Sequence, residues 1–172
     1  MQHHPRRVAV TASLLLTTAM GAVIPASAAT HTGATRQAPA TPLVANARWG
    51  GHCTFDRLVI DVRGTTPSVT VKPVKELRYD PSGKPVPLSG EHFLQITLSP
   101  ATAHSAAGQS VYQGPRLANI HLPQLRGLAL TGDFEGVVGF GTAFHAKPVY
   151  HTFKLHSPER FVLDVSHADR CA

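Results

Sequence analysis

Nearly the same phrase stands near both ends of the chain: FDRLVIDVRG at 55–64 and PERFVLDVSH at 158–167. In each copy an arginine is followed by three apolar residues and an aspartate. Successive side chains of a β-strand point to opposite faces, so each copy would present one apolar face and one face that carries Arg and Asp. The repeat therefore predicts two strands of the same design, each with one face in a core.

The charges of the repeat favour an antiparallel pairing of these two strands. If the middle valines of the two phrases lie opposite each other, Arg57 faces Asp164. The same pairing places Arg160 opposite Asp61. Opposite charges directly across a ladder stabilise it by about 0.2–1 kcal/mol each, whereas a parallel pairing would place like charges side by side. The alternative is that the phrase recurs only because it suits any strand.

The N-terminal region has the pattern of an export signal. Arg6 and Arg7 precede a mostly apolar run over 8–24, and the motif Ala26-x-Ala28 is of the kind that signal peptidase recognises. The run is short and is followed by small residues, which favours a cleaved signal over a membrane anchor. We predict a signal peptide at 1–28 and a secreted chain with no membrane span after cleavage. The route of export and retention on the cell wall stay open.

The two cysteines, Cys53 and Cys171, lie just before the first phrase and just after the second. Two cysteines in an exported domain are typical of one disulfide. An antiparallel pairing brings them together, whereas a parallel one would separate them by roughly 50 Å at about 3.3 Å per residue. Free thiols or a metal pair are the alternatives, but neither CxxC spacing nor a histidine cluster accompanies them. We predict a disulfide and no metal site.

The rest of the chain divides into a linker and one domain. Residues 29–46 are rich in Ala, Thr and Pro, which predicts a disordered linker. Residues 47–172 form the predicted domain, with 13 Lys and Arg against 10 Asp and Glu, a net charge of +3 compared with +6 for the whole chain. These basic residues are dispersed and form no stripe, so we expect no nucleic-acid partner.

Short alternating runs separated by Pro and Gly turns indicate an all-β fold. The segment HFLQITL alternates, and LALTGDFEGVVGFGTAF over 128–144 has the pattern of two strands around a tight turn. Pro73 in a predicted strand indicates an edge or a bulge. We expect a β-sandwich or partly open barrel of antiparallel strands, with a long loop at 101–124 that carries a short helix at 101–107.

Polar candidates for a site lie in two of these segments. Asp133 and Glu135 in GDFEG are suited to hold sugar hydroxyls, muramyl-peptide amines or a cation. The simpler interpretation, which we favour, is a turn in which Asp133 bonds its own backbone and Phe134 enters the core. His104 is a candidate base or ligand, although a lone loop histidine is more often solvated or hydrogen-bonded. The chain has no GxSxG or HExxH motif, so we predict no catalytic residue and no cofactor.

Aromatic and glycine residues supply the remaining candidates. Trp49 and Tyr112 are candidate exposed aromatics for stacking on sugars, with a structural role at the core edge as the alternative for Trp49. Gly139 and Gly141 share one face of a predicted strand. Such a face admits either a flat sugar ring or close packing within the sheet.

Five segments distributed over about 48–168 carry a family resemblance: GGHCTFDRLVIDVRG, LSPATAH, VYQGPR, GDFEGVVGFG and SPERFVLDVSH. In these segments the chain resembles the AMIN-like domain of secreted actinobacterial proteins, which is related to the AMIN domain of cell-wall amidases and secretins. The resemblance implies a non-catalytic β-sandwich that binds peptidoglycan or an associated wall glycan. One alternative is a secreted hydrolase that uses His104 with Asp133 or Glu135. Another is an inhibitor or protein-binding module that uses the 101–124 loop to hold a secreted or envelope protein.

Overall fold

The computed structural model describes residues 40–171, so the predicted signal peptide and most of the predicted linker lie outside the described residues. Within this range the chain forms strands and no helix, and therefore has no helix that could cross a membrane. The strands are β1 (Leu43–Gly51), β2 (Phe55–Arg63), β3 (Ser68–Val74), β4 (His92–Ser99), β5 (Leu117–Asn119), β6 (Leu125–Phe134), β7 (Val137–Phe144), β8 (Tyr150–Leu155) and β9 (Arg160–Ser166).

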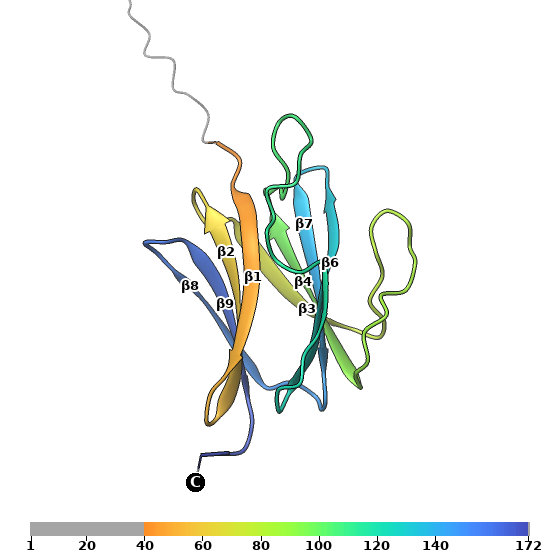
Figure 1. The fold of residues 1–172 in the computed structure, drawn as a ribbon, viewed down its shortest axis with the longest axis vertical. Helices are drawn as coiled ribbons and strands as arrows, with labels where there is room; N and C mark the ends of the chain where they lie inside the picture. The colour runs from red at the N-terminus through yellow and green to blue at the C-terminus, as the bar shows by residue number, and fades with distance from the viewer. Residues whose placement is uncertain (1–39, 172) are drawn as a thin grey trace, which may run out of the picture. The chain divides into compact units, whose positions relative to one another are not determined.

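These strands form two antiparallel sheets that lie face to face (Figure 1). One sheet has the order β1-β2-β9-β8 and the other the order β3-β4-β7-β6-β5. The sheets do not close into a barrel, so of the two predicted architectures the sandwich is correct. Pro73 lies in β3, which is an edge strand, one of the two placements that a proline in a strand indicates.

The repeated phrase forms the centre of the four-stranded sheet, in the predicted register. β2 and β9 pair antiparallel with Val59 opposite Val162 and Arg57 opposite Asp164. The Arg57 guanidinium donates two hydrogen bonds of 2.7 Å to the Asp164 carboxylate. This bidentate geometry is the strongest form of a charged pair in proteins.

The second predicted ion pair does not form. Asp61 lies opposite Arg160, as expected, but its carboxylate accepts two hydrogen bonds of 3.0 Å from Arg48 on β1. The Nε of Arg160 instead donates to the carbonyl of Pro158 in the preceding turn. The sequence pattern missed this exchange because Arg48 belongs to a third strand outside the repeat.

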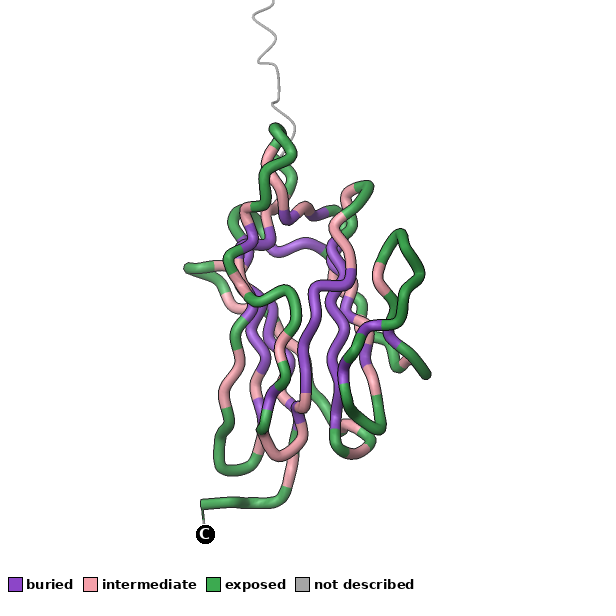
Figure 2. The backbone as a smooth tube through the Cα atoms, turned by 45° about the vertical axis from the view of Figure 1, so that its right-hand side comes forward, coloured by how far each residue is buried: buried purple, intermediate pink, exposed green. Residues whose placement is uncertain are grey.

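The apolar faces of both sheets meet in one core, and the buried positions run along the middle of the strands in Figure 2. The fully buried side chains that fill it include Leu58, Ile60, Leu94, Ile96, Leu98, Leu128, Val138, Phe140 and Leu163. All six inward residues of the two phrases belong to this core, which confirms the predicted inward faces: Leu58, Ile60, Val62, Phe161, Leu163 and Val165.

A second, smaller cluster lies on the outer face of the five-stranded sheet. The segment 75–91 crosses this face and packs Leu77 and Leu88 against its small residues. A Cβ on Gly141 would lie 2.7 Å from Leu77, and one on Gly139 would lie 2.6 Å from the Thr131 hydroxyl. Close packing within the chain therefore explains both glycines, and neither position offers a flat surface for a sugar ring.

The domain begins earlier than the composition predicts. β1 starts at Leu43, so residues 43–46, which the composition predicts as linker, belong to a strand. Val44 is fully buried, and its amide donates to the carbonyl of Thr102 at 2.8 Å. The Thr102 amide in turn donates to the carbonyl of Pro42 at 3.0 Å. A short apolar segment is thus held by pairing that linker-like composition does not reveal.

The helix expected at 101–107 is absent. Thr102 forms a β-bridge to β1, and His104 forms one to Ser110, so this part of the 101–124 loop is extended. Ala101 and Ala103 are buried and alternate with less buried neighbours, a period of two. The alanine content suggested a helix, but tertiary pairing overrides that weak preference.

The predicted disulfide is confirmed. Cys53 and Cys171 are bonded, with their Cα atoms 5.2 Å apart. The bridge joins the turn before β2 to the segment after β9, as the antiparallel pairing requires.

Reduction of this disulfide should lower the melting temperature. The bridge joins residues separated by 118 positions and restricts the unfolded chain. Its removal raises the entropy of the unfolded state, which lowers the free energy of unfolding by at most about 5 kcal/mol. Calorimetry with and without reductant measures the shift, with the far-ultraviolet circular dichroism of the reduced protein as the control for folding. An unchanged melting temperature in protein whose thiols are shown to be free would contradict this expectation.

A buried carboxylate also holds β2 in place. Asp56 is 1% exposed, and its Oδ2 accepts hydrogen bonds from the amides of Gln124 (2.6 Å) and Leu125 (2.9 Å). Nε2 of His167, which follows β9, lies 3.3 Å from the other oxygen. The side chain thus ties both sheets together where β6 begins.

Replacement of Asp56 by Ala should lower the free energy of unfolding by about 3–5 kcal/mol, because the buried amide of Leu125 and the partly buried amide of Gln124 lose their acceptor. Asp61→Ala is the matched control on the same strand. Its partner is half exposed, so the loss there should stay within about 1 kcal/mol. Urea denaturation of both variants gives the comparison, and equal losses would show that Asp56 is not a structural anchor.

Candidate ligand-binding groove

Two adjoining hollows lie along the end of β6, with volumes of about 540 and 310 Å³. They share Asp80, Gly132 and Asp133, and so form one groove. Residues of two segments line the groove: the 75–91 segment, drawn yellow-green at the right of Figure 1, and the 100–113 loop, drawn green at the top. Side chains of both charge signs line the larger hollow.

A β-bulge in β6 shapes this groove. The register of β6 shifts between Leu130 and Gly132, which changes the face to which the following side chains point. The Asp80 amide donates to the carbonyl of Thr131 at 2.8 Å. A Cβ on Gly132 would lie 2.9 Å from both Cβ and Oδ2 of Asp80, so only glycine leaves room for this carboxylate.

His104 and Asp133 meet in the groove. The His104 Nδ1 lies 2.7 Å from Oδ2 of Asp133, and Oδ1 of the same carboxylate accepts the amide of Ala103 at 2.9 Å. A carboxylate only accepts hydrogen bonds, so Nδ1 carries the proton in this pair. Asp133 thus fixes both the backbone and the ring of the 103–104 segment, and Nε2 is directed to other partners.

The turn that follows differs from the predicted one. Asp133 bonds the 103–104 segment and not its own backbone, and Phe134 is 56% exposed and lies outside the core. The bulge explains both results, because it turns Asp133 inward and Phe134 outward. Glu135 lies in the turn with a φ of 48° and lines the smaller hollow, but makes no hydrogen bond to His104. The structure therefore joins His104 to Asp133 and not to Glu135.

The two aromatic candidates for sugar stacking are not available as exposed faces. Tyr112 is 8% exposed, and its hydroxyl donates to the carbonyl of Pro115 at 3.1 Å. Burial raises the pKa of this Tyr112 hydroxyl above its usual value. Trp49 is partly buried against the core, in agreement with the alternative of a structural role at its edge.

Three groove residues were not singled out from the sequence: Tyr79, Asp80 and Arg116 line the larger hollow. The first two belong to the segment YDPSGKPV, whose pattern indicates only a turn. Their proximity to β6 depends on how the 75–91 segment crosses the sheet, and local sequence carries no signal for that path.

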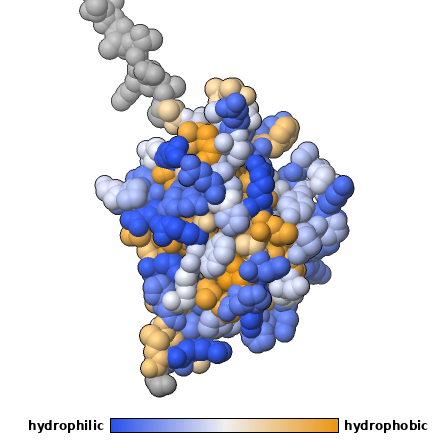
Figure 3. Space-filling view, in the orientation of Figure 1, coloured by the Kyte–Doolittle hydropathy of each residue, from blue (hydrophilic) through white to orange (hydrophobic). Residues whose placement is uncertain are grey.

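Exposed apolar side chains collect at this groove. In the view of Figure 3 hydrophobic groups lie scattered among hydrophilic ones. Of the large hydrophobic residues exposed in the described part of the chain, Leu117, Phe134 and Val137 line the two hollows, and Val149 and Tyr150 do not. The groove therefore combines carboxylates, a histidine, an arginine and an exposed aromatic ring.

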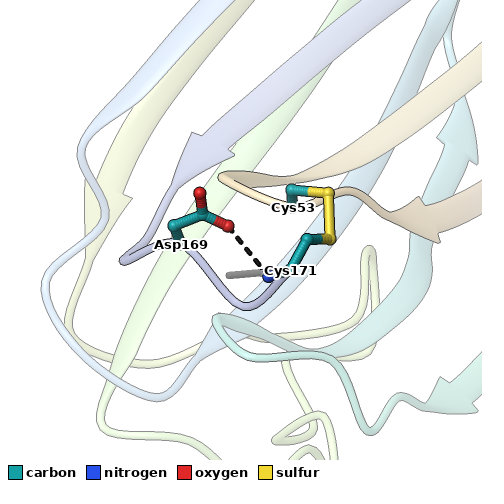
Figure 4. A group of neighbouring side chains, drawn as sticks. All are labelled: Cys53, Asp169 and Cys171. Atoms are coloured by element: carbon teal, nitrogen blue, oxygen red, sulfur yellow. Dashed lines mark hydrogen bonds between the residues drawn. A yellow bond between two sulfur atoms is a disulfide. The ribbon is translucent and has the colours of Figure 1, made fainter.

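One group of potential metal ligands occurs elsewhere in the described residues. Cys53, Asp169 and Cys171 place ligand atoms within 4.8 Å of one another. Figure 4 shows that both sulfur atoms are joined in the disulfide and that the Asp169 carboxylate accepts the Cys171 amide, at 2.8 Å. The cluster therefore offers no thiolate ligand in its oxidised form.

Replacement of Asp133 by Ala should loosen the groove loop and lower the free energy of unfolding by about 1.5–3 kcal/mol, the usual contribution of hydrogen bonds to a charged group. Glu135→Ala is the matched control. It removes a carboxylate two residues away that bonds no described residue, and should change stability by less than about 0.5 kcal/mol. Denaturation and amide exchange at Ala103 measure both effects. Protection of Ala103 that survives in the Asp133 variant would refute this role.

A family model of the AMIN-like domain matches residues 42–167. The match spans β1 to β9, and so includes both sheets and every residue of the groove. Neither the search of curated proteins nor that of solved structures gave a match. The family match covers most of the chain, agrees with the observed sandwich and begins just before β1. The chain therefore belongs to the AMIN-like domain family.

Proposed function

We propose that this chain is a secreted, non-catalytic module that binds peptidoglycan or an associated wall glycan through the groove. Membership of the AMIN-like family suggests a peptidoglycan-related binding module. The observation that carries the proposal is the exposed Phe134 ring beside the Asp80 and Asp133 carboxylates. The proposal includes export by the signal at 1–28.

The side chains of the groove match the chemistry of a wall glycan. Sugar hydroxyls and acetamido groups are hydrogen-bond donors, and the carboxylates of Asp80 and Glu135 are acceptors. The Phe134 ring offers an apolar face for the C–H groups of a sugar ring. Arg116 lines the other end of the groove and is suited to pair with carboxylates of the peptide stem.

The shape of the groove favours a polymer. The two hollows adjoin in a row, and the smaller one lies at a turn between two strands, where a long ligand can continue past it. Specific sites of this kind combine a few fixed polar groups with apolar contacts. Asp133 fixes the loop on one side of the groove, and Gly132 admits Asp80 on the other.

Phe134→Ala should weaken binding to purified peptidoglycan about three- to tenfold, as expected for loss of one aromatic contact of about 0.6–1.4 kcal/mol. Stability should hardly change, because the ring is exposed. The control is Val149→Ala, which removes an apolar side chain that is 72% exposed and lines neither hollow. Sedimentation with sacculi at low salt gives the bound fractions. If the mature domain stays in the supernatant, the proposed function is wrong.

The second candidate is a hydrolase, which the 2.7 Å contact between His104 and Asp133 favours. A carboxylate that orients a histidine is the arrangement of a general base. Within the described residues, however, Nε2 of His104 makes no hydrogen bond to a hydroxyl that could act as a nucleophile. The same sacculi distinguish the two functions: soluble fragments released by the wild type but not by His104→Gln would establish the hydrolase and overturn the non-catalytic proposal.

A further inference from the structure

A second polar surface lies on the outer face of the four-stranded sheet, away from the groove. The register places Gly50, Arg57, Asp164 and His151 in one row across all four strands. The Arg57 guanidinium lies over the ring of Phe55, 5.0 Å from its centroid. It also lies 5.5 Å from the centroid of the Phe153 ring. With the bidentate bond to Asp164, these contacts hold the guanidinium in one orientation.

A second arginine is held in the same way. Arg48 on β1 donates through Nε and Nη2 to Asp61, just as Arg57 does to Asp164. In both pairs the carboxylate occupies the same edge of the guanidinium. The remaining nitrogen, Nη1, makes no hydrogen bond to any residue of the described chain for either arginine. Each pair therefore leaves N–H donors unused on an arginine whose Nε and Nη2 are already bonded to a carboxylate.

These two arginines line one small hollow of about 150 Å³. Gly50 and Val59 also line it, and His52 adds a ring that stacks on Phe55 with centroids 4.3 Å apart. A Cβ on Gly50 would meet nothing within 4 Å, so the glycine leaves open the space beside Arg57.

The charged side chains that line the hollow are the two arginines. Their partners Asp61 and Asp164 bond the Nε and Nη2 atoms of these arginines and are not among the lining residues. At about 30 Å³ per water, the hollow holds a carboxylate or phosphate group and a few waters, but little more. Guanidinium groups fixed in advance bind such oxyanions with little loss of side-chain entropy.

We propose that this hollow, bounded by Arg48, Gly50 and Arg57, is a binding site for an oxyanion, either a carboxylate or a phosphate group. The site belongs to the other sheet and uses none of the groove residues, so it does not depend on the proposed glycan binding. Anionic groups on a wall polymer or on a small soluble metabolite have the required chemistry.

The test is a titration of the ¹⁵N-labelled full chain at low salt with two probes, glycerol 3-phosphate and N-acetylalanine. Saturable shifts of the Gly50 and His52 amides and of the Arg57 Nε–H signal are expected with at least one probe. A response to the phosphate alone identifies phosphate as the ligand group, and a response to N-acetylalanine identifies a carboxylate. Added salt should weaken either response.

Two variants check the location. Gly50→Val fills the hollow, and Arg48→Gln removes one donor while leaving the sheet intact. Each should weaken binding by about tenfold, the equivalent of one charge-assisted hydrogen bond. The control is Thr70→Val, which replaces an exposed hydroxyl with a methyl group on β3, in the other sheet. This variant should bind the probes as the wild type does. Absence of saturable shifts with both probes would overturn the proposal, as would wild-type affinity in folded Gly50→Val and Arg48→Gln.

Discussion

The pairing of β2 with β9 is the constraint on which the other features depend. It joins residues 107 positions apart through the bond between Arg57 and Asp164. It places the cysteines within bonding distance, and it brings His167 to the buried Asp56. It also presents the outer row on which the oxyanion site is built. The register of this one strand pair thus determines the disulfide, the contact between His167 and the buried Asp56, and one of the two proposed binding surfaces.

This constraint has a cost in folding. The centre of one sheet is made from the first and last thirds of the domain, so its ladder cannot form until nearly the whole chain is present. Folds dominated by such non-local pairs fold slowly, because loop closure costs entropy before the contacts form. Adjacent strands such as β6 and β7, joined by the two residues Glu135 and Gly136, do not carry this cost.

The alternation and charges of the repeat were enough to predict the pairing and its register, because both depend on which residues share a face of the strand. The disulfide could be predicted because the chain has two cysteines, an export signal and this antiparallel pairing. The same alternation gave the wrong prediction for Phe134, because the bulge in β6 reverses the faces to which the residues after it point. Composition failed at 43–46 and at 101–107, where tertiary hydrogen bonds decide the conformation. The groove could be predicted only in part: His104 and Asp133 were candidates, but their contact and the approach of Asp80 depend on three segments distant in sequence. The roles of these residues in ligand binding stay predictions.

The entry of the chain into the domain has a mechanical consequence. The backbone of Thr102 bonds both Pro42 and Val44, so the start of β1 is joined to the loop that carries His104. If the bound domain were pulled by its N-terminal side, force would enter through these bonds and load the rim of the groove before it reached the core. The nine-residue ladder of β1 would then be strained along its length, the direction in which paired strands resist best. Tension on the chain and its hold on a ligand would therefore act on the same loop.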